Sequence, residues 1–160
     1  MANKNTKTRR LSRGVGSLFG VGFFPFMPGT AAALVTACIA WLVARTVSLS
    51  LIWDIEIFLV LLLLGLLSAY DLIRHEGVKD PGWFVMDEAA GMWLALLGLP
   101  KDNLPVLAAA FAVFRIFDIA KPWIIKKADR LPGAAAIMLD DLLAAVPAWL
   151  TAFGLWKILS

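Results

Sequence analysis

The sequence predicts an all-α, polytopic membrane protein with about five membrane-embedded helices, several of them short or interrupted. Of its 160 residues 61% are hydrophobic and the mean hydropathy is +0.81, whereas soluble domains are roughly half apolar. Apolar runs recur along the whole chain and are separated by short polar segments. Seven tryptophans and ten phenylalanines suit a protein that is anchored at membrane interfaces.

The N-terminal part divides into a basic segment and a glycine-rich segment. Residues 1–13 carry five Lys and Arg residues, and we expect a disordered basic tail on the cytoplasmic side. Residues 14–160 are expected to form a single membrane-embedded domain. Glycine and proline interrupt residues 14–29, which predicts an interfacial loop. Thr30 follows, as an expected helix N-cap whose free amides could also bind an anion.

Five apolar runs are candidate crossings, and most are shorter than the about 20 residues that a perpendicular helix needs. Polar loops are expected at 71–82 and 121–132, with Asp54 and Glu56 at the membrane interface. The runs comprise residues 30–44, 51–70, 89–99, 104–119 and 142–159.

The distribution of basic residues orients these crossings. Three of the 15 Lys and Arg residues, Arg45, Lys101 and Lys157, fall on the far side, and the other twelve fall on the N-terminal side. The positive-inside rule therefore places the N-terminus in the cytoplasm. The pI near 9.2 does not indicate nucleic acid, because the basic residues flank apolar runs, where lipid head groups are the better partner. The sequence assigns no oligomeric state.

Charged residues gather at one membrane boundary in this topology. They include two separate pairs of neighbouring acids. They also include three charged residues, each three positions after the last, at the end of an apolar run. Residues three apart share a helix face, and charges at this depth are costly unless they pair or have a function. Gly91, four residues after Asp87, is expected to let a neighbour or ligand come close. The boundary residues are Thr30, Asp87, Glu88, Arg115, Asp118, Lys121, Asp140 and Asp141.

The residue types indicate metal and phosphate chemistry. The chain has one histidine and one cysteine, so a cluster of carboxylates suits a hard cation with oxygen ligands, Mg²⁺ first. Arg115 and Lys121 suit a phosphate group. Attack by a metal-activated water and attack by a carboxylate both remain open. A small ion-coupled transporter is the alternative, but it would need charges near the middle of the bilayer.

Four blocks of the sequence resemble the phosphatidylglycerophosphatase A family, and together they extend over most of the chain. The resemblance implies a Mg²⁺-dependent phosphatase of the bacterial inner membrane. Such an enzyme hydrolyses the phospholipid phosphatidylglycerophosphate to phosphatidylglycerol and inorganic phosphate. The domain 14–160 is then the catalytic domain. The blocks are Pro28-Gly29-Thr30, Met86-Asp87-Glu88 with Gly91, Phe114 to Pro122, and Ile137 to Asp141.

The resemblance also implies roles for individual residues. The chain departs from the family's usual pattern where alanine replaces glycine, as at Ala144-Ala145, but every charged position is kept. The implied catalytic acids are Asp87, Glu88, Asp118, Asp140 and Asp141. The implied metal ligands are Asp87, Glu88, Asp118 and Asp141, and the implied phosphate-binding residues are Thr30, Arg115 and Lys121.

Overall fold

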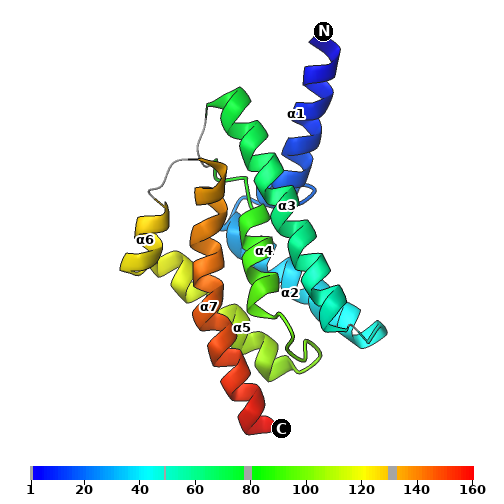
Figure 1. Cartoon of the computed structure of the whole chain (residues 1–160), viewed down its shortest axis with the longest axis vertical. Helices are drawn as coiled ribbons and strands as arrows, with labels where there is room; N and C mark the ends of the chain where they lie inside the picture. Colours follow the sequence, from blue (N-terminus) through cyan, green and yellow to red (C-terminus); the bar gives the residue numbers. More distant parts are fainter. Residues whose placement is uncertain (1, 49, 78–80, 130–132) are drawn as a thin grey trace.

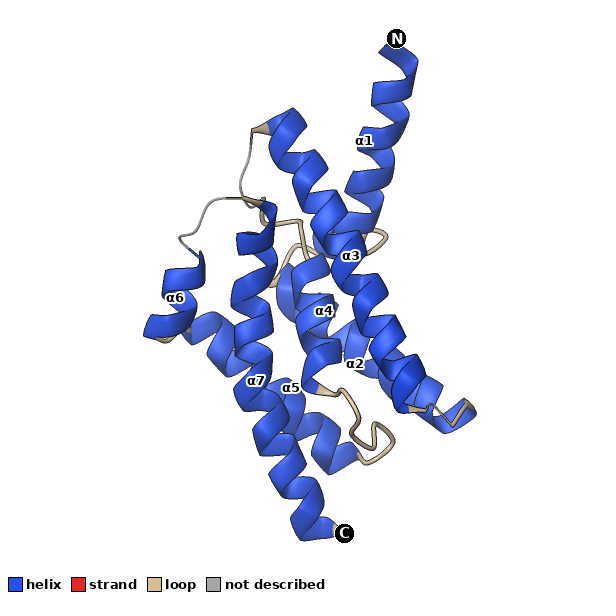
Figure 2. Cartoon of the chain, in the orientation of Figure 1, coloured by secondary structure: helices blue, strands red, loops and turns tan. Residues whose placement is uncertain are grey.

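The computed structural model describes residues 2–48, 50–77, 81–129 and 133–160. Every regular element in these ranges is helical and none is a strand, which confirms the all-α prediction (Figure 2). The elements are α1 (Ala2–Gly16), the 3-10 helix η1 (Val21–Phe23), α2 (Pro28–Thr46), α3 (Leu51–Glu76), α4 (Met86–Ala95), α5 (Leu104–Ala120), α6 (Trp123–Asp129) and α7 (Ala134–Leu159).

The short helix α4 lies in the middle of the bundle, and the two chain ends lie at opposite ends of the molecule (Figure 1). α4 packs against α7, α2, α3 and α5, while α1 packs against α3 and α6 against α7. Small side chains let these helices approach closely, as in membrane bundles. The main core includes a stripe of fully buried alanines on α2 and α7: Ala33, Ala37, Ala40, Ala144, Ala145, Ala148 and Ala152.

Three of the described helices, α2, α3 and α7, are long and apolar enough to cross a membrane. Helix α4 has 10 residues and is about 15 Å long, roughly half the hydrocarbon thickness. Helix α5, with 17 residues, is also shorter than a typical span. The expected count of five crossings is therefore not confirmed.

Three segments that were expected to be irregular are helical. Residues 2–16 form α1 instead of a disordered tail, because the end of this helix packs against α3. The first half of the expected loop 71–82 continues α3, which ends where Gly77 adopts a left-handed conformation. Part of the expected loop 121–132 forms α6. Lys79 and Arg130, two of the basic residues that were used to orient the crossings, lie outside the described residues.

The start of α2 also differs from the expectation. Met27, at φ 49°, is the N-cap, and Pro28 occupies the first helical turn, where its fixed φ is favourable. Thr30 therefore lies inside the helix, and the expectation that it caps the helix is wrong. Its hydroxyl is buried and has no hydrogen-bond partner, so it remains available to a ligand.

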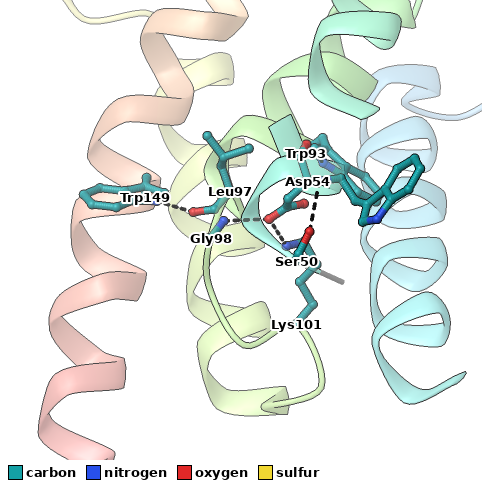
Figure 3. A network of polar contacts seen from close by, with 8 residues as sticks. Ser50, Asp54, Trp93, Leu97, Gly98, Lys101 and Trp149 are labelled. Atoms are coloured by element: carbon teal, nitrogen blue, oxygen red, sulfur yellow. Dashed lines mark hydrogen bonds and ion pairs between the residues drawn. The ribbon is translucent and has the colours of Figure 1, made fainter. Parts of the chain in front are cut away.

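A buried ion pair connects α3 to the turn that follows α4 (Figure 3). The Lys101 ammonium lies 2.6 Å from Asp54 Oδ2, and these residues are only 4% and 2% exposed. The backbone N–H of Gly98 donates to the same oxygen at 2.7 Å. Asp54, which was expected at the membrane interface, is enclosed within the protein by Lys101 and the turn after α4.

Two tryptophans complete this network. Trp93 Nε1 donates to the backbone carbonyl of Asp54 at 3.1 Å. Trp149 Nε1, on α7, donates to the carbonyl of Leu97 at 2.8 Å. The network joins α3, the turn after α4 and α7, and so fixes α4 at the end opposite its acidic first turn (Figure 3).

We expect Lys101→Met to destabilise the protein by about 3–5 kcal/mol, because it leaves the Asp54 carboxylate buried without its counter-ion. Unfolding in detergent, followed by circular dichroism, measures this loss. The matched control is Lys126→Met, at an exposed lysine on α6, which should change stability by less than about 0.5 kcal/mol. Equal stability of the two variants would contradict a stabilising pair.

Candidate functional site

The first turn of α4 meets α7 through three carboxylates. Asp87, Glu88 and Asp141 each offer one oxygen, and these three oxygens lie within 4.8 Å of one another. Asp87 and Asp141 are buried and Glu88 is half-buried. Two adjacent acids and a third that lies at least 53 positions further along the chain therefore form one compact set of oxygen donors.

Helix α5 adds a carboxylate and two cationic groups. The Arg115 guanidinium pairs with Asp118 one turn later on the same helix face. Asp118 in turn interacts with Asp141. Lys121 Nζ lies 2.7 Å from Asp140 Oδ2 on α7. Lys121 ends α5 in a left-handed conformation, with φ 40°, which is uncommon for a residue other than glycine.

The structure thus brings together all of the charged residues that the sequence placed at one boundary. The carboxylate cluster, as we call Asp87, Glu88 and Asp141, is bordered by the Arg115–Asp118 and Lys121–Asp140 pairs. Asp141 lies near Glu88, Asp118 and Asp140. The roles of these residues stay predictions, but their convergence from α4, α5 and α7 is a property of the fold.

Two glycines make room for this arrangement. A Cβ atom at Gly29 would lie 2.0 Å from Glu88 Oε1, so the first turn of α2 contacts Glu88 directly. A Cβ atom at Gly91 would lie 2.8 Å from the Phe114 ring and 3.0 Å from the backbone carbonyl of Asp141. The expectation that Gly91 admits a close neighbour is confirmed. The sequence singled out the Pro28-Gly29-Thr30 block but not this role of Gly29, because the helix was expected to begin after it.

Buried polar atoms without partners concentrate here. Among the described residues, six buried side-chain N or O atoms lack a hydrogen bond, and four belong to this site. Such atoms are costly and are often explained by a missing water or ion. Two are carboxylate oxygens, which are the ligands Mg²⁺ prefers; one is a guanidinium N–H, which suits an oxyanion. The four atoms are Thr30 Oγ1, Glu88 Oε2, Arg115 Nε and Asp141 Oδ2.

Fold and site together define a small helical membrane protein with a polar centre suited to a divalent cation and a phosphate. The sequence profile of the phosphatidylglycerophosphatase A family matches residues 14–156. The chain belongs to this family. It is therefore a phosphatase of phospholipid biosynthesis, which confirms the reaction class that the sequence predicted.

Individual relatives agree with this assignment. Phosphatidylglycerophosphatase A of Escherichia coli is 36% identical over 131 residues, which are 80% of this chain and 73% of the relative. The Haemophilus influenzae protein of the same name is 35% identical over 142 residues, 86% of this chain and 83% of the relative. A Bacteroides thetaiotaomicron protein, provisionally named a phosphatidylinositol-3-phosphatase, is 37% identical over 149 residues, 90% and 93% of the two chains. No solved structure matches the chain.

We expect Gly29→Ala to reduce phosphatase activity by about 100-fold, since a displacement of about 1 Å in a catalytic group can have this effect. The added methyl group would displace Glu88 from its present position. The matched control is Gly154→Ala on α7, where a Cβ meets nothing within 4 Å. Full activity of folded Gly29→Ala protein would show that the position of Glu88 is unimportant.

Proposed function

We propose that the chain hydrolyses phosphatidylglycerophosphate to phosphatidylglycerol and inorganic phosphate in a Mg²⁺-dependent reaction. The site would lie at the cytoplasmic boundary of the bacterial inner membrane, in a multi-pass protein with a cytoplasmic N-terminus. The carboxylate cluster, with Arg115 and Lys121 beside it, is the observation that carries this proposal. The names of the Escherichia coli and Haemophilus influenzae relatives support the substrate.

The residues present fit a magnesium ion. Asp87, Glu88 and Asp141 would hold it, because their oxygens converge and two of those residues have an oxygen without a hydrogen bond. Asp118 borders them and interacts with Asp141, which suits a further ligand. When bound there, Mg²⁺ would supply charge neutralisation for phosphoryl oxygens and would lower the pKa of a bound water molecule.

The cationic residues and Thr30 would bind the phosphate. Arg115 uses one terminal nitrogen for Asp118, and its Nε has no partner, so part of its planar fork remains for an oxyanion. Lys121 is positioned through its pair with Asp140. The Thr30 hydroxyl can donate to a phosphate oxygen near the N-terminus of α2, where the helix dipole favours negative charge.

Proton transfer would fall to a carboxylate. Hydrolysis of a phosphate ester requires that water lose a proton and that the leaving oxygen gain one. Asp118 and Asp140 are the candidates outside the carboxylate cluster, and each is oriented by a cation. The boundary position would let a lipid keep its tails in the bilayer while its phosphate enters the site. The ion-coupled transporter gains no support from the family or from the relatives.

We expect phosphate release from phosphatidylglycerophosphate in detergent micelles with Mg²⁺, and its loss in excess EDTA. Soluble glycerol 3-phosphate should be a poor substrate, because it lacks the tails that hold a lipid at the site. Phosphatidylinositol 3-phosphate tests the activity named for the Bacteroides relative. Release that persists in EDTA would contradict the metal dependence, and no release from folded protein would contradict the proposed function.

The same assay tests the acids. Asp118→Asn and Asp141→Asn should each lower phosphate release by at least about 100-fold, as removal of a central catalytic electrostatic group does, while both variants still insert into membranes. The matched control is Glu56→Gln, at an exposed acid on α3, which should stay within twofold of wild type. Retained activity in both aspartate variants would contradict the proposed roles of Asp118 and Asp141.

A further inference from the structure

We propose that the apolar groove between residues 20–27 and α2 holds an acyl chain of the phospholipid substrate and selects among lipid tails. This proposal rests on the proposed function, because it assigns a binding site for the part of the substrate that does not react. The groove lies outside the carboxylate cluster, and none of its apolar residues has a role in the chemistry described above.

The groove has the size and lining of a lipid-tail site. Its volume is about 710 Å³, within the range of small-molecule pockets. Several lining side chains are large, apolar and exposed, which is unfavourable in water but suits contact with hydrocarbon. The apolar walls include Val21, Phe23, Phe24 and Met27 on one side and Leu34 and Val35 of α2 on the other.

The groove and the candidate site share the first turn of α2. Thr30 lines the groove, and its buried hydroxyl has no hydrogen-bond partner. The preceding residue, Gly29, lies directly against Glu88. A single helical turn therefore has apolar space on one side and the carboxylate cluster on the other. This juxtaposition fits an amphiphile with its phosphate at the cluster and its tail in the groove.

The outer wall of the groove is fixed to the segment that leads into α4. A Cβ atom at Gly22 would lie 1.9 Å from the Trp83 carbonyl oxygen, so the two backbones touch. The Phe23 and Trp83 rings are 5.9 Å apart. Trp83 precedes Asp87 by four residues. A tail that fills the groove would therefore contact a wall connected to the acidic first turn of α4.

Residues in the left-handed backbone conformation flank the outer wall of the groove. Phe19 and Met27, at φ 54° and 49°, adopt the left-handed region at either end of the wall. This conformation costs about 1–3 kcal/mol in a residue other than glycine and persists where the surrounding structure enforces it. The chain thereby presents aromatic side chains outwards and then turns sharply into α2. A plain membrane anchor would need exposed apolar residues, but it would not need a groove that Thr30 lines.

The test is a bulky substitution in the groove, read out as chain-length selectivity. Leu34→Trp narrows the groove, and Leu59→Trp on α3 is the matched control: the two leucines are 50% and 52% exposed. The substrates are dioleoyl and dihexanoyl phosphatidylglycerophosphate in the same detergent. We expect Leu34→Trp to lower the long-to-short ratio of kcat/KM by about tenfold, a typical effect of altered pocket fit. Leu59→Trp should leave the ratio unchanged.

An unchanged ratio in Leu34→Trp, or an equal fall in Leu59→Trp, would overturn the groove assignment and leave the proposed function intact. If wild-type protein hydrolyses neither substrate, the proposed function fails instead. A second measurement needs no turnover: photolabelling of wild-type protein by phosphatidylglycerol with a diazirine in one acyl chain. Labelling concentrated in residues 20–35 supports the groove, and labelling spread evenly over the exposed faces of α3 and α7 overturns it.

Discussion

The contact between the first turn of α4 and α7 is the constraint on which the rest of the structure depends. There, Asp87 and Glu88 meet Asp141 in a largely buried position. Carboxylates this close repel one another and are poorly solvated, so the arrangement is unfavourable without a balancing cation. The fold nevertheless places them together, which is understandable if their purpose is to hold that cation.

Neighbouring elements are shaped by this contact. Helix α2 can reach Glu88 because Gly29 has no side chain, and α4 can approach α7 because Gly91 has none. Helix α5 ends in the left-handed Lys121, which pairs with Asp140. At the far end of α4, the Asp54–Lys101 pair fixes the turn that follows. A short helix held at both ends is a rigid support for a reactive site.

The site was more predictable from the sequence than the fold was. A charge beside an apolar run has few structural roles. The acid pairs and the charged triad that begins at Arg115 were therefore predicted to lie in one site, and the structure brings them together. Helix boundaries were less predictable: residues 2–16 form a helix whose end packs against α3, a tertiary contact that local composition does not encode. The Asp54–Lys101 pair was missed because its partners are 47 residues apart and share no local pattern.

Binding of Mn²⁺, a paramagnetic substitute for Mg²⁺, tests the central claim most directly. Electron paramagnetic resonance of detergent-solubilised protein, titrated with Mn²⁺, separates bound from free ion. The account predicts a bound ion in wild-type protein and in Glu56→Gln, and loss of that ion in Asp141→Asn. Equal binding by wild type and Asp141→Asn, or no bound Mn²⁺ in protein that releases phosphate, would contradict a metal site at the junction of α4 and α7.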